Sequence, residues 1–168
     1  GKGLRMSRSL LISLSKNMIK LKYRVKYFGI EDHVNIGSQE FPTLYIIPSL
    51  YRVITYDGAH PWEKDVTVEK SVPAFPSFLN FSTTEYWSSY IDDNDFGIAV
   101  FGASRSPYFI ATKITGSRVN YLNYSSSFNI PSNSIYKNEV YLLIGNIAAT
   151  REQIYELVPP PMSKTELI

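Results

Sequence analysis

The sequence predicts an all-β fold, an antiparallel β-sandwich with one short C-terminal helix. Many short runs alternate between apolar and polar residues, and turn signals separate them at intervals near ten residues. Aromatic residues make up 14% of the chain, which favours a sheet protein because flat rings pack well on a pleated surface. Residues 151–157 alone carry convincing helix signals, so sheets must supply most of the core.

The length and hydrophobic content indicate one domain. A chain of 168 residues with 44% hydrophobic residues can bury one substantial core, and a second full domain is not expected. We therefore expect a single β-sandwich domain over residues 1–158. Residues 159–168 begin with three prolines and are expected to form a proline-rich tail or a linker to neighbouring domains of a longer chain.

The first strands are predicted at residues 9–15 and 19–27. The second has the clearest alternation in the chain, with apolar residues on one face and a basic row on the other, formed by Lys20, Lys22, Arg24 and Lys26. The basic row could bind an anionic ligand, or it could be a solvated face whose lysines guard an edge strand against pairing. We expect the second alternative.

Residues 29–37, which contain His33, are predicted to be a loop, and residues 38–47 a strand. Pro42 lacks an N–H donor, so this strand should lie at a sheet edge or carry a bulge. Another strand is expected at residues 51–56. Residues 59–84 show no sustained period and are predicted to be a long ordered loop that holds Trp62.

A central hairpin is predicted at residues 85–102. Residues 92–95 read Asp-Asp-Asn-Asp and form a turn, because these side chains bond their own backbone. We expect residues 97–101 to be buried on both faces, and residues 86–91 to have one face that is partly wet. Further strands are expected at 108–115, 119–124 and 139–145. The helix should begin after Thr150 as N-cap, with Gln153 completing a capping box.

Charge and composition exclude several classes of function. A net charge of +2 is too small to indicate a nucleic-acid partner, because phosphate binding needs clustered cations. No stretch approaches the ~20 apolar residues of a membrane span, so no membrane insertion is expected. The absence of cysteine excludes disulfides, thiolate zinc sites and a cysteine nucleophile.

The sequence contains no strong catalytic motif. His33 and His60 are the only histidines and lie in no nucleophile motif, and residues 92–95 lack the spacing of a calcium loop, so we expect no metal and no cofactor. Glu40, Asp57 and Glu85 could supply an acid–base pair for a glycosidic bond if the protein is an enzyme. The other interpretation is that these are ordinary acidic residues at strand ends.

Aromatic side chains give a better functional signal. Tyr45, Trp62 and Trp87 could stack on sugar rings while Gln39 bonds hydroxyl groups. The alternative is that most of these rings are core; we expect this of Trp87, while both alternatives stay open for Trp62. We predict a shallow groove between the strand of Gln39 and Glu40, Asp57 and the Trp62 loop. This groove would meet a saccharide or a neighbouring domain.

Three segments carry a resemblance to a known group of proteins. They are residues 39–45 (QEFPTLY), 55–62 (TYDGAHPW) and 84–101 (TEYWSSYIDDNDFGIAVF). Over residues 18–157 the chain resembles β-sandwich domains of large microbial carbohydrate-active proteins, some of them described as glycosyl hydrolases. These are similar in outline to the galactose-mutarotase-like sandwich of sugar-processing enzymes. The chain departs from the pattern at Thr43, and at Ser88 and Ser89.

The resemblance implies carbohydrate contact without assigning catalysis. Our first hypothesis is a carbohydrate-binding or accessory domain of a larger protein, with an oligo- or polysaccharide as partner. The alternatives are a catalytic glycoside hydrolase or polysaccharide lyase domain that uses a carboxylate pair, and a structural or protein-interaction domain of a cell-surface protein. A secreted or cell-surface location is favoured under all three, but the sequence itself leaves localisation open.

Overall fold

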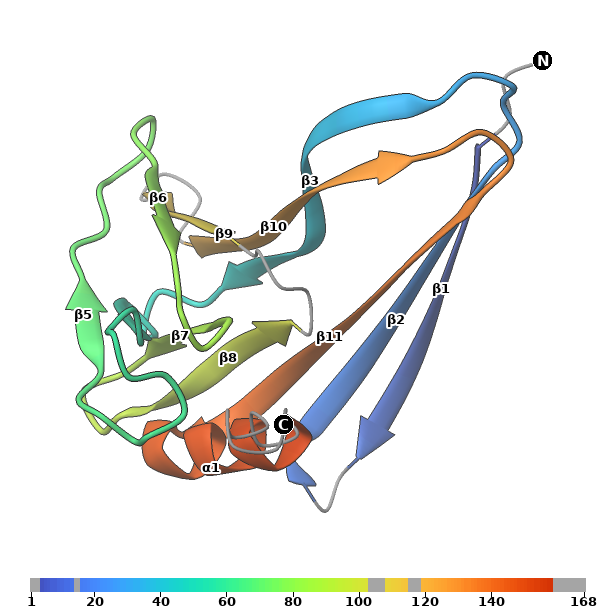
Figure 1. Cartoon of the computed structure of the whole chain (residues 1–168). Helices are drawn as coiled ribbons and strands as arrows, with labels where there is room; N and C mark the ends of the chain where they lie inside the picture. Colours follow the sequence, from blue (N-terminus) through green and yellow to red (C-terminus); the bar gives the residue numbers. More distant parts are fainter. Residues whose placement is uncertain (1–3, 14–15, 103–107, 115–118, 159–168) are drawn as a thin grey trace.

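A computed structural model of the chain describes residues 4–13, 16–102, 108–114 and 119–158. They form two antiparallel sheets and one helix, which confirms the predicted all-β sandwich (Figure 1). The seven-stranded sheet has the order β1 (Leu4–Ser13), β2 (Met18–Tyr27), β11 (Ile135–Asn146), β8 (Phe96–Gly102), β7 (Trp87–Ile91), β4 (Arg52–Thr55) and β5 (Val68–Lys70). The four-stranded sheet has the order β3 (His33–Ile46), β10 (Val119–Ile130), β9 (Tyr108–Ile114) and β6 (Leu79–Ser82).

The predicted hairpin forms the middle of the seven-stranded sheet. β7 and β8 pair antiparallel, and Ile91 lies opposite Gly97. The turn is fixed by Asp92 Oδ1, which accepts the backbone N–H groups of Asn94 at 2.8 Å and Phe96 at 3.0 Å. A Cβ atom on Gly97 would lie 1.9 Å from the carbonyl oxygen of Tyr90, so the close approach of the two strands requires glycine here.

The middle of the seven-stranded sheet is covered on both faces. One hydrophobic cluster fills the space between the two sheets and includes Tyr90 and Leu122. A second cluster lies on the opposite face of the seven-stranded sheet and includes Trp87 and Ile154, the latter from α1 (Ile147–Leu157). All five residues of β7 are therefore buried, and the expectation of a partly wet face on this strand is wrong.

The basic row does not lie on an edge strand. β2 pairs with β1 on one side and with β11 on the other, so the expectation that its lysines guard an edge is wrong. The alternation itself is confirmed, because Leu21, Tyr23 and Val25 are buried while Lys22 and Arg24 are exposed.

β3 is an edge strand, as Pro42 predicted, and its register against β10 is shifted near Asn123 and Ser125. It begins at His33, so residues 33–37 are strand and not loop. β10 likewise continues to Ile130 beyond the predicted end, and residues 59–84 contain the short strands β5 and β6. In each of these segments the strand signals are weak, and pairing with a neighbouring strand gives the segment its extended conformation.

α1 begins one turn before the predicted position. The side chain of Asn146 caps it by accepting the N–H of Ala148 at 3.0 Å, and Thr150 lies inside the helix and is buried. Thr150 is therefore not the N-cap: β11 runs directly into the helix, and Asn146 is the last extended residue before it. No helix in the described ranges is long and apolar enough to cross a membrane. The predicted proline-rich tail lies outside the described residues.

Candidate functional site

The candidate residues lie in two regions of the sandwich, and the first surrounds Glu85. This side chain is completely buried just before β7. Its carboxylate accepts hydrogen bonds from the Trp62 backbone N–H (2.9 Å), Trp87 Nε1 (2.9 Å) and the Tyr155 hydroxyl (2.6 Å). Arg151 adds a bidentate ion pair, with Nε at 2.9 Å and Nη2 at 2.7 Å. We call these five residues the Glu85 hub.

Burial alone would raise the pKa of Glu85. The hydrogen bonds from Arg151, Tyr155, Trp87 and the Trp62 backbone outweigh burial and hold the pKa of Glu85 below its usual range. Burial, reinforced by the bond to Glu85, raises the pKa of Tyr155 to about 12. Glu85 is therefore an ionised acceptor whose oxygens are already bonded by protein donors, and this suits it to holding the fold together.

The Glu85 hub also fixes an unusual backbone. Trp62, Lys64 and Tyr86 have φ angles of 72°, 60° and 60°, in the left-handed region that bulky residues rarely adopt. The Trp62 N–H is held by Glu85, and the Lys64 N–H donates to the Tyr155 hydroxyl at 3.2 Å. The partly exposed Trp62 ring packs on the rings of Tyr86 and Tyr155, at centroid distances of 6.0 and 5.6 Å.

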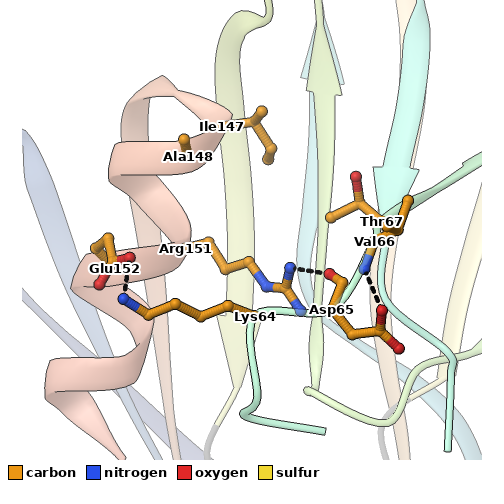
Figure 2. A pocket seen from close by; sticks show the side chains of 8 residues that line it. All are labelled: Lys64, Asp65, Val66, Thr67, Ile147, Ala148, Arg151 and Glu152. Atoms are coloured by element: carbon orange, nitrogen blue, oxygen red, sulfur yellow. Dashed lines mark hydrogen bonds and ion pairs between the residues drawn. The ribbon is translucent and has the colours of Figure 1, made fainter. Parts of the chain in front are cut away.

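A cavity of about 330 Å³ lies next to the Glu85 hub, between α1 and residues 64–67 (Figure 2). Its lining consists of Lys64, Asp65, Val66, Thr67, Ile147, Ala148, Arg151 and Glu152. Lys64 pairs with Glu152 at 2.6 Å, Arg151 bonds the carbonyl oxygen of Asp65, and the Asp65 carboxylate accepts the N–H of Val66. The charged groups on the wall are thus already paired within the protein, and a ligand would gain little from them.

Two further candidate residues, Trp87 and Asp57, also have structural roles. Trp87 is completely buried and offers no ring face to a ligand, so it is core. Asp57 pairs with Lys70 of β5, at one edge of the seven-stranded sheet.

The second region is the outer face of the four-stranded sheet. Tyr45 on β3 is 70% exposed and lies directly opposite Tyr121 of β10, with ring centroids 5.8 Å apart. The Phe78 ring lies 6.2 Å from that of Tyr121, and the Phe75 ring 5.9 Å from that of Phe78. Phe75 and Phe78 are both about half exposed. These four residues form a continuous line of rings, which we call the aromatic row.

The alternation of the strands and one side chain position the aromatic row. Leu122 and Ile46 point into the core, so their neighbours Tyr121 and Tyr45 point outward. Thr112 of β9 holds the loop that carries the two phenylalanines, because its hydroxyl donates to the carbonyl oxygens of Ser77 (2.7 Å) and Pro73 (3.3 Å). The rings therefore rest on a fixed backbone.

A carboxylate lies beside the aromatic row. Glu40 is exposed and accepts hydrogen bonds from the Tyr121 hydroxyl at 2.6 Å and the Thr43 hydroxyl at 2.5 Å. Burial, together with the bond to Glu40, raises the pKa of Tyr121 to about 12, so Tyr121 remains a donor at neutral pH. Gln39 belongs to β3 opposite Ser126, and its side chain lies outside what the structure describes.

The structure does not form the single predicted groove. Glu40 and Tyr45 lie together on the outer face of the four-stranded sheet, whereas Trp62 packs in the cluster on the far face of the seven-stranded sheet. Both sheets and the core lie between the two regions. Tyr121, Phe78 and Phe75 were missed by the sequence reasoning; alternation in residues 119–124 marks Tyr121 as outward, but no sequence signal gives its register against β3.

The described part of the chain contains no group of three or more His, Asp or Glu residues that could hold a metal ion. The arrangement on the four-stranded sheet offers flat apolar surface beside a charged hydrogen-bond acceptor. It can therefore contact a ligand that has both C–H faces and hydroxyl groups.

Comparison of the sequence with family models and with curated proteins gives no match. Among solved structures, the chain is similar to the Slr1438 protein from Synechocystis sp. PCC 6803, with 10% identity, a TM-score of 0.47, and coverage of 86% of this chain and 56% of the other. It is also similar to a "putative aldose 1-epimerase" from Klebsiella pneumoniae subsp. pneumoniae MGH 78578, with 8% identity, a TM-score of 0.51, and coverage of 92% and 50%.

The chain spans about half the length of these two structures. At such low identity the second likeness shows the fold alone. The chain thus shares an overall fold with part of that second structure, and the comparison extends no further.

Proposed function

We propose that this chain is a carbohydrate-binding β-sandwich domain and that the aromatic row receives the sugar. The observation that carries the proposal is the pairing of the exposed Tyr45 ring with Tyr121, whose hydroxyl is bonded to the exposed Glu40 carboxylate.

The chemistry of this surface suits a saccharide. A sugar ring has an apolar C–H face, which Tyr45 and Phe78 can cover with flat rings, and hydroxyl groups, which Glu40 can accept. Exposed rings collected in one place are unusual on a soluble surface and indicate an interaction site. The resemblance to carbohydrate-active proteins and the description of the second structural neighbour as a "putative aldose 1-epimerase" give further support.

Binding is favoured over catalysis by the surroundings of the three carboxylates. A glycosidase of the usual kind needs two carboxyl groups about 5–10 Å apart. Glu40 is bonded to two hydroxyl groups, Asp57 is paired with Lys70, and Glu85 is buried against Arg151. A protein-interaction domain would use the same aromatic row. Measurement of glycan binding distinguishes this alternative from a carbohydrate-binding domain.

The test measures the affinity of the purified chain for glycans. A glycan array identifies a ligand, and titration calorimetry then compares the wild type with Tyr45→Ala. We expect Tyr45→Ala to lower the affinity by about 1 to 2 kcal/mol, the scale of a lost aromatic contact. Its melting temperature should stay nearly unchanged, because the Tyr45 ring is mostly exposed.

Phe96→Ala is the matched control. Phe96 is about half exposed where β8 of the seven-stranded sheet begins, and it has no ring contact with the aromatic row among the described residues, so its loss should leave sugar binding unchanged. A loss of affinity in Trp62→Ala but not in Tyr45→Ala would overturn the aromatic row as the site and move it to the Trp62 ring beside Tyr86 and Tyr155. Absence of any glycan ligand, with a protein partner that depends on Tyr45, would overturn the proposal in favour of the interaction domain.

A further inference from the structure

Glu40, beside the aromatic row, is a carboxylate whose described partners are all neutral. Its two oxygens accept hydrogen bonds from the hydroxyl groups of Tyr121 at 2.6 Å and Thr43 at 2.5 Å. Among the described residues, no Lys or Arg forms an ion pair with Glu40. The negative charge of this exposed side chain is therefore not compensated by a cation in the described part of the chain.

The rings of the aromatic row also lack a cation. The cation–π contacts among the described residues occur at other rings, and none of them involves the row. Lys113 of β9 lies next to Thr112, which holds the loop of the two phenylalanines on the outer face. Alternation along β9 instead places Lys113 on the face of the core residue Ala111. The outer face thus combines electron-rich ring faces with an uncompensated carboxylate.

Glu40 keeps acceptor capacity for a ligand. An ionised carboxylate has about four acceptor positions on its two oxygens, and the hydroxyl groups of Tyr121 and Thr43 use one on each oxygen. A hydrogen bond between an ammonium group and a carboxylate is roughly twice as strong as one between neutral groups. An ammonium group therefore gains more from Glu40 than a sugar hydroxyl group does.

We propose that the aromatic row binds glycans built from amino sugars with free, protonated amines, such as glucosamine. This inference rests on the proposed function and narrows it to a class of sugar. A glucosamine unit presents an apolar C–H face, which the rings of Tyr45 and Phe78 can cover, and an ammonium group, which Glu40 can accept.

A peptide with a cationic side chain is the other ligand that this charge would suit. The sugar is favoured by the arrangement of the rings. Successive centroids of the row lie 5.8, 6.2 and 5.9 Å apart in a line, which matches the length of an extended chain of sugar rings. Methylated ammonium groups of peptides are instead bound by aromatic side chains that form a cage around one point.

The test uses three oligomers of equal length and the same linkage, made of glucosamine, N-acetylglucosamine and glucose. They carry an ammonium, an acetamido and a hydroxyl group at the same carbon, so only this group differs. Titration calorimetry measures their binding to the full chain at mildly acidic pH, where the amine is protonated and Glu40 is ionised. We expect the glucosamine oligomer to bind about fivefold more tightly than the neutral oligomers, the scale of a favourable exposed ion pair. Added salt should reduce this preference.

Glu40→Gln tests the role of the charge. The amide keeps the size of the side chain and one acceptor oxygen but removes the negative charge. It should weaken binding of the glucosamine oligomer about fivefold and leave the neutral oligomers nearly unaffected, so that the preference disappears. Glu63→Gln is the matched control, because Glu63 is exposed beside Trp62 on the far side of the sandwich and its loss changes the net charge equally. This control should keep the full preference.

Equal affinity of the wild type for all three oligomers would overturn this inference and leave the carbohydrate-binding function standing, provided that Tyr45→Ala weakens all three. Equal losses in Glu40→Gln and Glu63→Gln would show a response to net charge alone and would also overturn it. Binding of a trimethyllysine peptide without binding of any oligomer would assign the row to a protein partner, and both proposals would then fail.

Discussion

At the scale of single residues, Glu85 determines how one side of the molecule is held together. Its two carboxylate oxygens accept hydrogen bonds from a loop, from β7 and from α1. A buried ion pair is costly to assemble, but removal of one partner leaves the other charge uncompensated in a medium of low polarity. Removal of Glu85 would therefore lower the stability of the fold mainly because the buried guanidinium of Arg151 would lose its counter-charge.

Glu85→Gln tests this role. The amide keeps the shape of the side chain but places an NH₂ group toward donors, and Arg151 loses its counter-charge. We expect the free energy of unfolding, measured with urea, to fall by about 3 kcal/mol, the scale of a broken buried pair. Glu40→Gln is the control, because this carboxylate is exposed. It should change the free energy of unfolding by less than about 0.5 kcal/mol. A loss as small as the control's would show that the Glu85 hub is not structural.

At the scale of elements, the junction of β11 and α1 shows how local chemistry sets a boundary. Asn146, the last residue of β11, pairs with Phe96 of β8, and its side chain also caps the helix. Asn146→Ala should cost about 1 kcal/mol of stability, because the N–H of Ala148 loses its acceptor. Asn146→Asp keeps the acceptor and adds a negative charge at the helix N-terminus, so it should match or exceed the wild type. Equal thermal unfolding midpoints for all three proteins would argue against this cap.

Elements with strong local signals could be predicted from the sequence. The alternation of β2, the Asp-rich turn before β8 and the edge position implied by Pro42 all appear in the structure. Partners in the sheet could not be predicted, because pairing depends on contacts far apart in the chain. For that reason the place of β1 outside β2 and the second covered face of β7 were missed.

The candidate site was predictable only in part for the same reason. Glu40 and Tyr45 lie on one strand, and the sequence selected both. Tyr121 is brought beside them by a strand about 80 positions later, and Phe78 by a loop that Thr112 holds. The sequence analysis named Trp62 for its ring and Glu85 for its carboxylate. In the structure the two residues meet in a structural role, since Glu85 fixes the backbone of Trp62.

At the scale of the whole molecule, carboxylates with lowered pKa values link folding to pH. Backbone N–H groups, that of Phe96 foremost, hold the pKa of Asp92 below its usual range, and the hydrogen bond from Lys20 does the same for Glu139. The pKa of Glu85 is also lowered. A folded-state pKa below the unfolded value, about 4 for these residues, gives stability that is complete above the unfolded pKa and lost as pH falls through the folded pKa.

The free energy of unfolding should therefore stay nearly constant from pH 7 to about pH 5 and decline below about pH 4.5, as urea titrations at a series of pH values would show. Added salt separates the contributions by their exposure. The ion pair of Glu139 and the turn at Asp92 are open to solvent, so 1 M NaCl should reduce their contribution to the pH dependence of stability. The pair of Glu85 and Arg151 is buried and therefore shielded from ions. Most of the acid destabilisation should thus persist in high salt. Its disappearance in salt, or a rise in stability toward pH 4, would show that exposed charges and not the Glu85 hub control the response.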